Sequence, residues 1–146
     1  MAKTPLDKQI EKARKEAQRN AYKEELRQRA ASIVSSQPII NGVRIIDDTA
    51  ETVLNCLLEN CKDSSTGHVS YDNDIFPQAV SRSIGLEIEK LIQYGMVTSY
   101  IPWANGGMLN LLPCSFSYFE RKATAQAMSL ASTTGEKVDS IIFISH

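Results

Sequence analysis

One order of elements within residues 69–112 restricts the fold of this chain more than any other feature. It consists of a short strand, helical sequence, a tight turn and a two-stranded ribbon. The helical spacing of apolar residues begins at Ile75, and it fits two helices with a turn near residues 81–83 as well as one kinked helix. A single apolar stripe runs along this segment, made by Val80, Ile84, Ile88, Leu91 and Ile92. The residues expected to face outward are Glu87, Glu89, Lys90 and Gln93.

A β-ribbon is predicted after this helical segment. Gly95 stands where a helix C-terminal glycine belongs, because glycine takes the left-handed conformation that other residues resist. Residues 96–101 and 108–112 are the ribbon strands, and they are expected to turn at Asn105-Gly106-Gly107. Asn-Gly between two apolar runs is the strongest short hairpin signal.

The N-terminal residues 1–34 predict one long, basic, amphipathic helix. Its apolar stripe is narrow and rich in alanine: Leu6, Ile10, Ala13, Ala17, Ala21, Leu26, Ala30 and Ile33. Residues 1–29 hold nine Lys/Arg and five Asp/Glu, a net charge of +4, so the rest of the chain carries −5. Three roles for the helix stay open: a solvated helix on its own domain, self-association with another copy, and contact with nucleic acid or lipid.

The remaining elements complete a core over residues 39–130. Residues 39–46 are extended with a turn at Asn41-Gly42, and Asp48 or Thr49 offers an N-cap for the next helix. The apolar face of that helix is Ala50, Val53, Leu54, Leu57, Leu58 and Cys61. Pro113 starts a last helix, with one side lined by Phe116, Phe119, Ala123, Ala127 and Leu130.

A linker and a strand are predicted for residues 131–146. Ser132-Thr133-Thr134-Gly135 has the composition of a linker. Residues 138–145 form a nearly continuous apolar run, which is typical of a strand buried on both faces of a parallel sheet. The run is interpreted either as the first strand of a further domain or as a strand that pairs with the main domain.

The block from Ala50 to Arg121 resembles the winged helix-turn-helix superfamily. Residues 88–97 are similar to the helix, glycine and hydrophobic-pair signature of these domains, and Leu112-Pro113 with residues 117–120 is similar to the helix that follows the wing. The fold class expected is therefore α+β, a winged helix with a long N-terminal helix and a C-terminal strand. This resemblance implies either a DNA reader or a protein docking module, since winged helices serve as both.

The last residues, Ile142-Phe143-Ile144-Ser145-His146, resemble the first strand of bacterial TIR (Toll/interleukin-1 receptor) domains. The order of segments along the chain, a winged module followed by a linker and this strand, is similar to that of bacterial TIR defence proteins. Enzymatic members cleave NAD with a glutamate far downstream of this strand, and no position of this chain corresponds to it. We therefore expect no enzymatic activity, no catalytic residue and no cofactor.

The sequence patterns exclude several other kinds of site. Cys56 and Cys61 lie five apart with no second Cys/His pair, so no metal site is predicted, and Cys61 belongs to an apolar stripe. His68 stands alone before a strand and is interpreted as a surface histidine. Three cysteines, no apolar signal region and no membrane-length apolar run favour the cytoplasm and no membrane contact.

DNA reading is the alternative function that the charges disfavour. Its candidate contacts are Gln78, Ser81, Arg82 and Ser83 at the helix, with Lys12, Lys15 and Arg19 of the N-terminal helix on phosphates. Asp72, Asp74, Glu87 and Glu89 stand against Arg82 and Lys90 on this face, a balance of −2 that repels the DNA backbone. The wing tip also lacks Arg and Lys.

A protein contact is the function that the sequence favours. Tyr100 and Trp103 are its candidate residues, because exposed aromatic side chains beside a turn anchor partners. Trp103 can equally cap the core against the last helix. The sequence thus predicts a non-enzymatic interaction or regulatory module, the sensing or adaptor part of a bacterial TIR-type antiphage defence protein. The alternative is a winged-helix transcriptional regulator that binds DNA.

Overall fold

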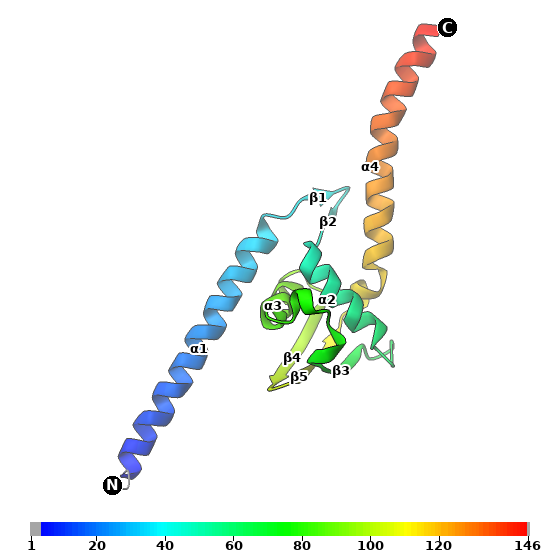
Figure 1. Cartoon of the computed structure of the whole chain (residues 1–146). Coiled ribbons are helices and arrows are strands. Elements are labelled where there is room, and N and C mark those ends of the chain that lie inside the picture. The colour runs from blue at the N-terminus through cyan, green and yellow to red at the C-terminus, as the bar shows by residue number, and fades with distance from the viewer. Residues whose placement is uncertain (1–3, 146) are drawn as a thin grey trace.

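A computed structural model describes the backbone of residues 4–145 and the side chains of residues 4–131. Over this range the fold is mixed α+β, with a long N-terminal helix as expected and two small antiparallel sheets (Figure 1). The elements are α1 (Pro5–Ser35), β1 (Ile39–Ile40), β2 (Val43–Arg44), α2 (Asp48–Glu59), β3 (His68–Asp72), the short 3₁₀ helices η1 (Asn73–Ile75) and η2 (Gln78–Val80), α3 (Ile84–Gln93), β4 (Val97–Trp103), β5 (Gly106–Leu111) and α4 (Pro113–Ser145).

The long helix α1 packs on the domain through its C-terminal half alone. It begins with a capping box, in which Thr4 and Asp7 satisfy each other's backbone N–H groups. Ala30 and Val34 are buried, whereas Leu6 and Ile10 are 65% and 52% exposed. The first turns of α1 therefore extend past the domain (Figure 1), and the predicted apolar stripe finds a partner at one end only.

The core lies between α2, α3 and the larger sheet, whose strand order is β3-β5-β4. The α3 stripe is confirmed, since Val80, Ile84, Ile88 and Leu91 are buried and Ile92 is partly buried. The predicted outward position of Glu87 and Lys90 is wrong: both are buried, 2% and 3% exposed. They form an ion pair with each other, which is what allows charged groups to leave water.

The segment between β3 and β4 resolves the alternative that periodicity left open. The turn at residues 81–83 separates η2 from α3, and the first helix is reduced to 3₁₀ turns. Asp47 is the N-cap of α2, its carboxylate accepting from the Ala50 N–H, so the N-cap prediction at Asp48 or Thr49 is wrong by one or two positions. Gly95 has φ +78°, as expected for the residue that ends α3.

The ribbon turns one residue earlier than predicted, at Ala104-Asn105. Gly106 and Gly107 lie inside β5 instead of in the turn. A Cβ at Gly106 would stand 2.1 Å from the Tyr71 carbonyl oxygen, so the glycine is required by close approach of β5 to β3. Ser99, with φ +57°, lies in an irregularity of β4 between Thr98 and Ile101.

The buried face of α4 overlaps the predicted one only at Phe119, which is partly buried against the core. Phe116 and Leu130 are exposed, while Ser115, Tyr118 and Ala125 are buried. The reason is the Tyr118 hydroxyl, which accepts from the Ile46 N–H at 2.8 Å and donates to Glu51 at 2.6 Å. Lys122 adds an ion pair to the same carboxylate. The spacing of apolar residues in the sequence does not indicate these polar contacts of Tyr118 and Lys122.

The linker and the strand predicted at the C-terminus are both replaced by helix, because α4 continues through residues 132–145. A lone strand would leave its backbone N–H and C=O groups unpaired, whereas a helix pairs them within its own segment. His146 lies outside the described residues. In the part of the chain that the structure describes, no helix combines the length and the apolar character needed to cross a membrane.

Candidate protein-interaction site

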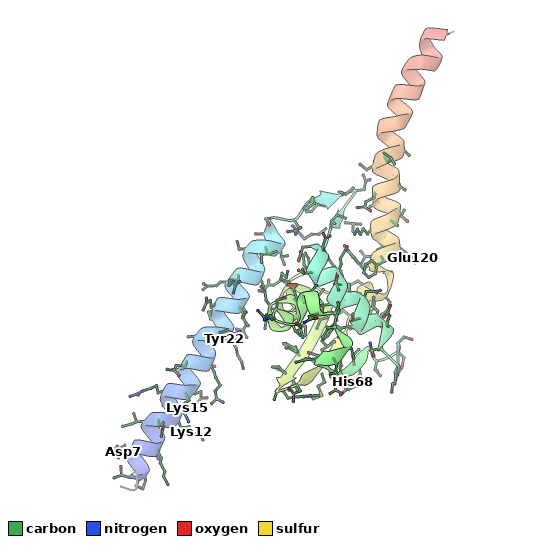
Figure 2. All side chains as sticks on the ribbon, in the orientation of Figure 1. Asp7, Lys12, Lys15, Tyr22, His68 and Glu120 are labelled. Atoms are coloured by element: carbon green, nitrogen blue, oxygen red, sulfur yellow. The ribbon has the colours of Figure 1, made fainter. Side chains whose placement is uncertain are left out.

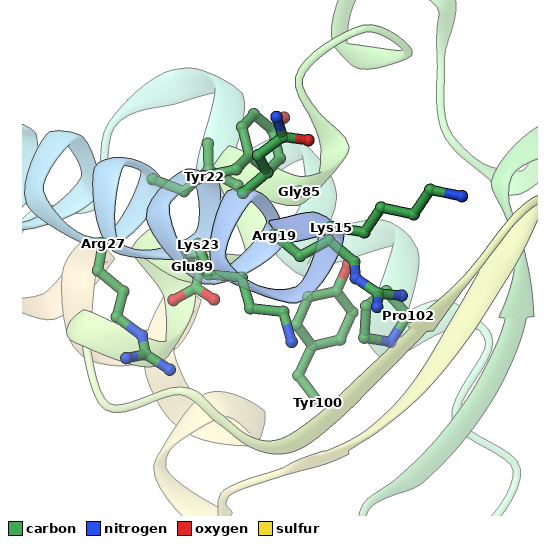
Figure 3. Close-up of a pocket in the computed structure, with 11 residues that line it drawn as sticks. Lys15, Arg19, Tyr22, Lys23, Arg27, Gly85, Glu89, Tyr100 and Pro102 are labelled. Carbon is green, nitrogen blue, oxygen red and sulfur yellow. The ribbon is translucent and has the colours of Figure 1, made fainter. Parts of the chain in front are cut away.

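A groove lies between α1, α3 and β4 (Figure 3). Its volume is about 640 Å³. Gly85 marks the crossing, since a Cβ there would stand 3.9 Å from Leu26 Cδ1 of α1. A Cβ at Gly85 would therefore be in ordinary van der Waals contact with Leu26, so the two helices lie close together at this point.

Three elements supply the walls. The residues that line it are Lys15, Gln18, Arg19, Tyr22, Lys23, Leu26 and Arg27 from α1, Gly85 and Glu89 from α3, and Tyr100 and Pro102 from β4. The side chains of α1 form one basic wall, and the opposite wall is largely uncharged (Figure 3).

The basic wall is a regular row of cations. Lys15, Arg19, Lys23 and Arg27 are each four residues apart, which places them along one ridge of α1 at steps of about 6 Å. Glu89 is the one carboxylate among the lining residues, so they carry a net charge of +3. The pairing of Arg27 with Glu24, at 3.7 Å, joins two side chains that are more than half exposed, and such pairs contribute little. Arg27 therefore keeps most of its capacity for an anionic ligand.

The other wall offers aromatic and apolar surface. Tyr100 of β4 is partly buried there, while Tyr22, 63% exposed, stands beside the cations on α1. Burial raises the pKa of Tyr100, so the phenol stays neutral near pH 7. Pro102 lies on the same side as Tyr100, and Leu26 adds apolar surface from α1. Cations beside exposed rings are suited to bind an anionic chain that also carries apolar groups.

A buried ion cluster fixes α3 on the start of α2. Lys90 Nζ lies 2.6 Å from Asp47 Oδ2 and 2.5 Å from Glu87 Oε1, and it donates to Thr49 Oγ1 at 3.1 Å. The Tyr94 hydroxyl donates to Asp47 Oδ1 at 2.6 Å. Burial tends to raise the pKa of Asp47, but the hydrogen bonds from Lys90 and Tyr94 outweigh it and lower that pKa. Lys90 is therefore a structural residue and does not face a ligand.

The four residues predicted to read bases are not part of the groove. Gln78, Ser81 and Arg82 are exposed and Ser83 is partly buried, in η2 and the turn that precedes α3. Asp72 and Asp74 are exposed nearby, and Glu89 is partly exposed. Because Glu87 and Lys90 cancel in the interior, the surface balance of this segment stays at −2, the value expected from the sequence.

The candidate residues of α1 divide between two places. Lys15 and Arg19 line the groove, whereas Lys12 is exposed on the part of α1 beyond it (Figure 2). Lys23 and Arg27 continue the four-residue spacing of Lys15 and Arg19, so the sequence could have indicated them. Their position beside α3 could not be predicted, because it depends on the contact at Gly85.

The two predicted aromatic contacts also separate. Tyr100 faces α1 across the groove (Figure 3). Trp103 is 46% exposed at the end of β4, with its indole nitrogen 2.8 Å from where a Gly106 Cβ would be. Trp103 thus lies over β5 and does not cap the core against α4. Tyr22, which no sequence pattern marks as a contact, is the other aromatic residue of the groove.

The cysteines and His68 lie elsewhere on the domain. Cys56, Cys61 and Cys114 are free and partly buried, so Cys61 is less enclosed than its place on an apolar stripe suggested. His68 Nδ1 is 3.3 Å from Asn110 Oδ1 on the exposed side of β3 and β5. Within the described residues, no three His, Cys, Asp or Glu side chains are grouped as metal ligands.

No protein-family model, curated protein or solved structure matches this chain.

Proposed function

We propose that this chain is a non-enzymatic interaction or regulatory module built on a winged-helix domain. The order α2, β3, η2, α3, β4, β5 and the sheet order β3-β5-β4 support the winged-helix assignment. In this assignment η2 stands in the place of the second helix, α3 in that of the recognition helix, and the β4–β5 ribbon is the wing.

The position of α1 is the observation that favours a protein ligand over DNA. A recognition helix enters a major groove about 12 Å wide, and a single helix with its side chains already measures about 10–12 Å across. Since α1 packs on the flank of α3 at Gly85, the two helices together are too wide to enter. The helix α1 covers part of the surface between α3 and the wing. The groove that remains between α1, α3 and β4 is open to another ligand.

The charges support the same choice. Lys90 is held by Asp47 and Glu87 in the interior and cannot contact phosphate. Arg82 is then the remaining cation of the segment, and the carboxylates of Asp72 and Asp74 in the same segment are exposed. Such a surface repels a DNA backbone.

A place for this module in a bacterial TIR-type defence protein stays a prediction, as does its cytoplasmic location. The resemblance to a TIR strand depends on residues 142–146, and residues 142–145 belong to α4 here. The proposal of an interaction module does not depend on that resemblance.

The alternative function, a winged-helix transcriptional regulator, would use the exposed cations of α1 on phosphates. We expect weak binding of DNA duplexes at low salt without sequence preference, and steep loss of affinity as salt rises. Replacing Lys12, Lys15 and Arg19 together by Gln should abolish this weak binding of DNA. Arg82→Ala should leave it unchanged, because α3 does not read the duplex. Fluorescence anisotropy with random-sequence duplexes at several salt concentrations measures both effects.

Selection from a random duplex library distinguishes the interaction module from the DNA-binding regulator. The interaction module predicts no enriched motif. An enriched motif whose affinity falls about fivefold or more with Arg82→Ala or Gln78→Ala would establish the regulator instead.

A further inference from the structure

We infer that the groove between α1, α3 and β4 binds an acidic segment of a partner protein that carries an aromatic or large aliphatic side chain. This inference rests on the proposed function and names the class of its partner. It combines the spacing of the cations, the apolar surface opposite them and the position of Glu89.

The cation row sets the spacing of the acidic groups. Successive cations on the ridge from Lys15 to Arg27 are separated by about 6 Å, from a rise of about 1.5 Å per residue. In an extended chain, alternate side chains lie on the same face about 6.6 Å apart. A segment with Asp or Glu at alternate positions therefore matches the row closely over three or four charges. A sequence with adjacent acids would not.

The uncharged wall selects the other side chains of the segment. Alternate positions of an extended chain face away from the acids, toward the wall formed by Tyr100 and Pro102 of β4. A cavity of about 640 Å³ accommodates a large side chain of the partner. Tyr22, exposed on α1, is free to close over it. An aromatic or leucine-sized side chain between two acids meets both requirements.

Glu89 distinguishes a peptide from a nucleic acid strand. A nucleic acid carries one negative charge on every nucleotide, so a strand that follows the cation row would bring a phosphate against Glu89. A peptide avoids this by placing an uncharged or basic residue there. The net charge of −5 outside residues 1–29 also disfavours a long polyanion near the domain.

A second copy of this chain is not a suitable occupant. Two pairs of acids stand at alternate positions in the chain. Glu87 and Glu89 enclose Ile88, but Glu87 and Ile88 are buried in α3. Asp72 and Asp74 are flanked by Tyr71 and Phe76. Both aromatic side chains are buried in the core, where their rings contact each other edge to face. Offering this segment to a neighbouring molecule would require the domain to unfold.

The test uses the full chain and a short fluorescent peptide with glutamates at alternate positions around a central tryptophan. We expect saturable binding by anisotropy that weakens with salt. Arg19→Glu combined with Lys23→Glu should lower the affinity about tenfold or more, because two attractions become repulsions. Tyr100→Ala should lower it about fivefold by removing part of the apolar wall.

Matched controls separate the groove from general attraction to a basic helix. Lys8→Glu with Lys12→Glu makes the same charge change on α1 outside the groove, and it should alter the affinity less than about twofold at moderate salt. A peptide with alanine in place of tryptophan and one with adjacent glutamates should bind more weakly. Circular dichroism of each variant verifies that α1 remains helical.

Several results would overturn the inference. One is an equal loss of affinity with the groove pair and with the control pair of substitutions. Others are tighter binding of a single-stranded oligonucleotide than of the acidic peptide, and a concentration-dependent dimer that the peptide does not dissociate. A random peptide library that yields a neutral motif would overturn the acidic partner and leave the interaction module standing. An enriched DNA duplex motif would instead refute the module itself.

Discussion

Replacing Lys90 by Met is expected to lower the free energy of unfolding by about 3–5 kcal/mol, the cost of breaking a buried ion pair by removing one partner. Methionine keeps most of the volume, so the loss comes from charge. Glu87 would be left as a carboxylate that is 2% exposed and has lost its cation, and Asp47 would lose its ion pair and keep the hydrogen bond from Tyr94. Urea denaturation followed by circular dichroism measures the change.

Two controls identify the cause of this loss. Lys62→Met, at an exposed position before β3, should change stability by less than about 0.5 kcal/mol. Adding Glu87→Gln to Lys90→Met should recover a large part of the loss, because a neutral side chain replaces the uncompensated charge. A loss below about 1 kcal/mol for Lys90→Met alone would mean that the cluster is open to water.

Ile88→Ala is the second substitution with a large expected effect, a loss of about 2–5 kcal/mol through lost burial and a residual cavity. Ile88 is completely buried in the core formed with α2 and the larger sheet. The matched control is Ile101→Ala in β4, where the side chain is 51% exposed and the expected loss is small. Thermal melts of the two variants compare the same chemical change in two environments. Equal melting temperatures would show that the α3 stripe is not core.

The parts of the fold that depend on local pattern could be predicted from the sequence. The apolar stripe of α3, the strand β3, the left-handed Gly95 and the existence of the ribbon all followed from spacing and from turn residues. The parts that failed depend on partners distant in the chain. Lys90 was expected outside because its partner Asp47 lies 43 residues away, and Tyr118 is turned inward by Ile46 and Glu51.

The C-terminal segment failed for another reason. A continuous apolar run has no periodicity that separates a buried strand from a helix. Residues 138–145 were interpreted as a strand on composition, and the helix that begins at Pro113 continues through them. An unpartnered strand would leave backbone N–H and C=O groups without hydrogen bonds, and this favours the helix that is observed.

The groove shows a similar division. Tyr100 was a candidate contact from the sequence, and the spacing of Lys15, Arg19, Lys23 and Arg27 was available there as well. What no local pattern contained was that α1 folds back against Gly85 and turns this row toward β4. The same contact creates the groove and narrows access to α3.

The most direct test of this account is a nuclear Overhauser measurement between the Leu26 methyl protons and the Gly85 α-protons in the full chain. With Leu26 Cδ1 in van der Waals range of the Gly85 position, a clear cross-peak is expected, and it should persist in dilute samples that contain no dimer. The absence of this cross-peak, with fast backbone motion throughout residues 5–35, would mean that α1 is detached. The groove would then not exist, and α3 with its wing would be open to DNA.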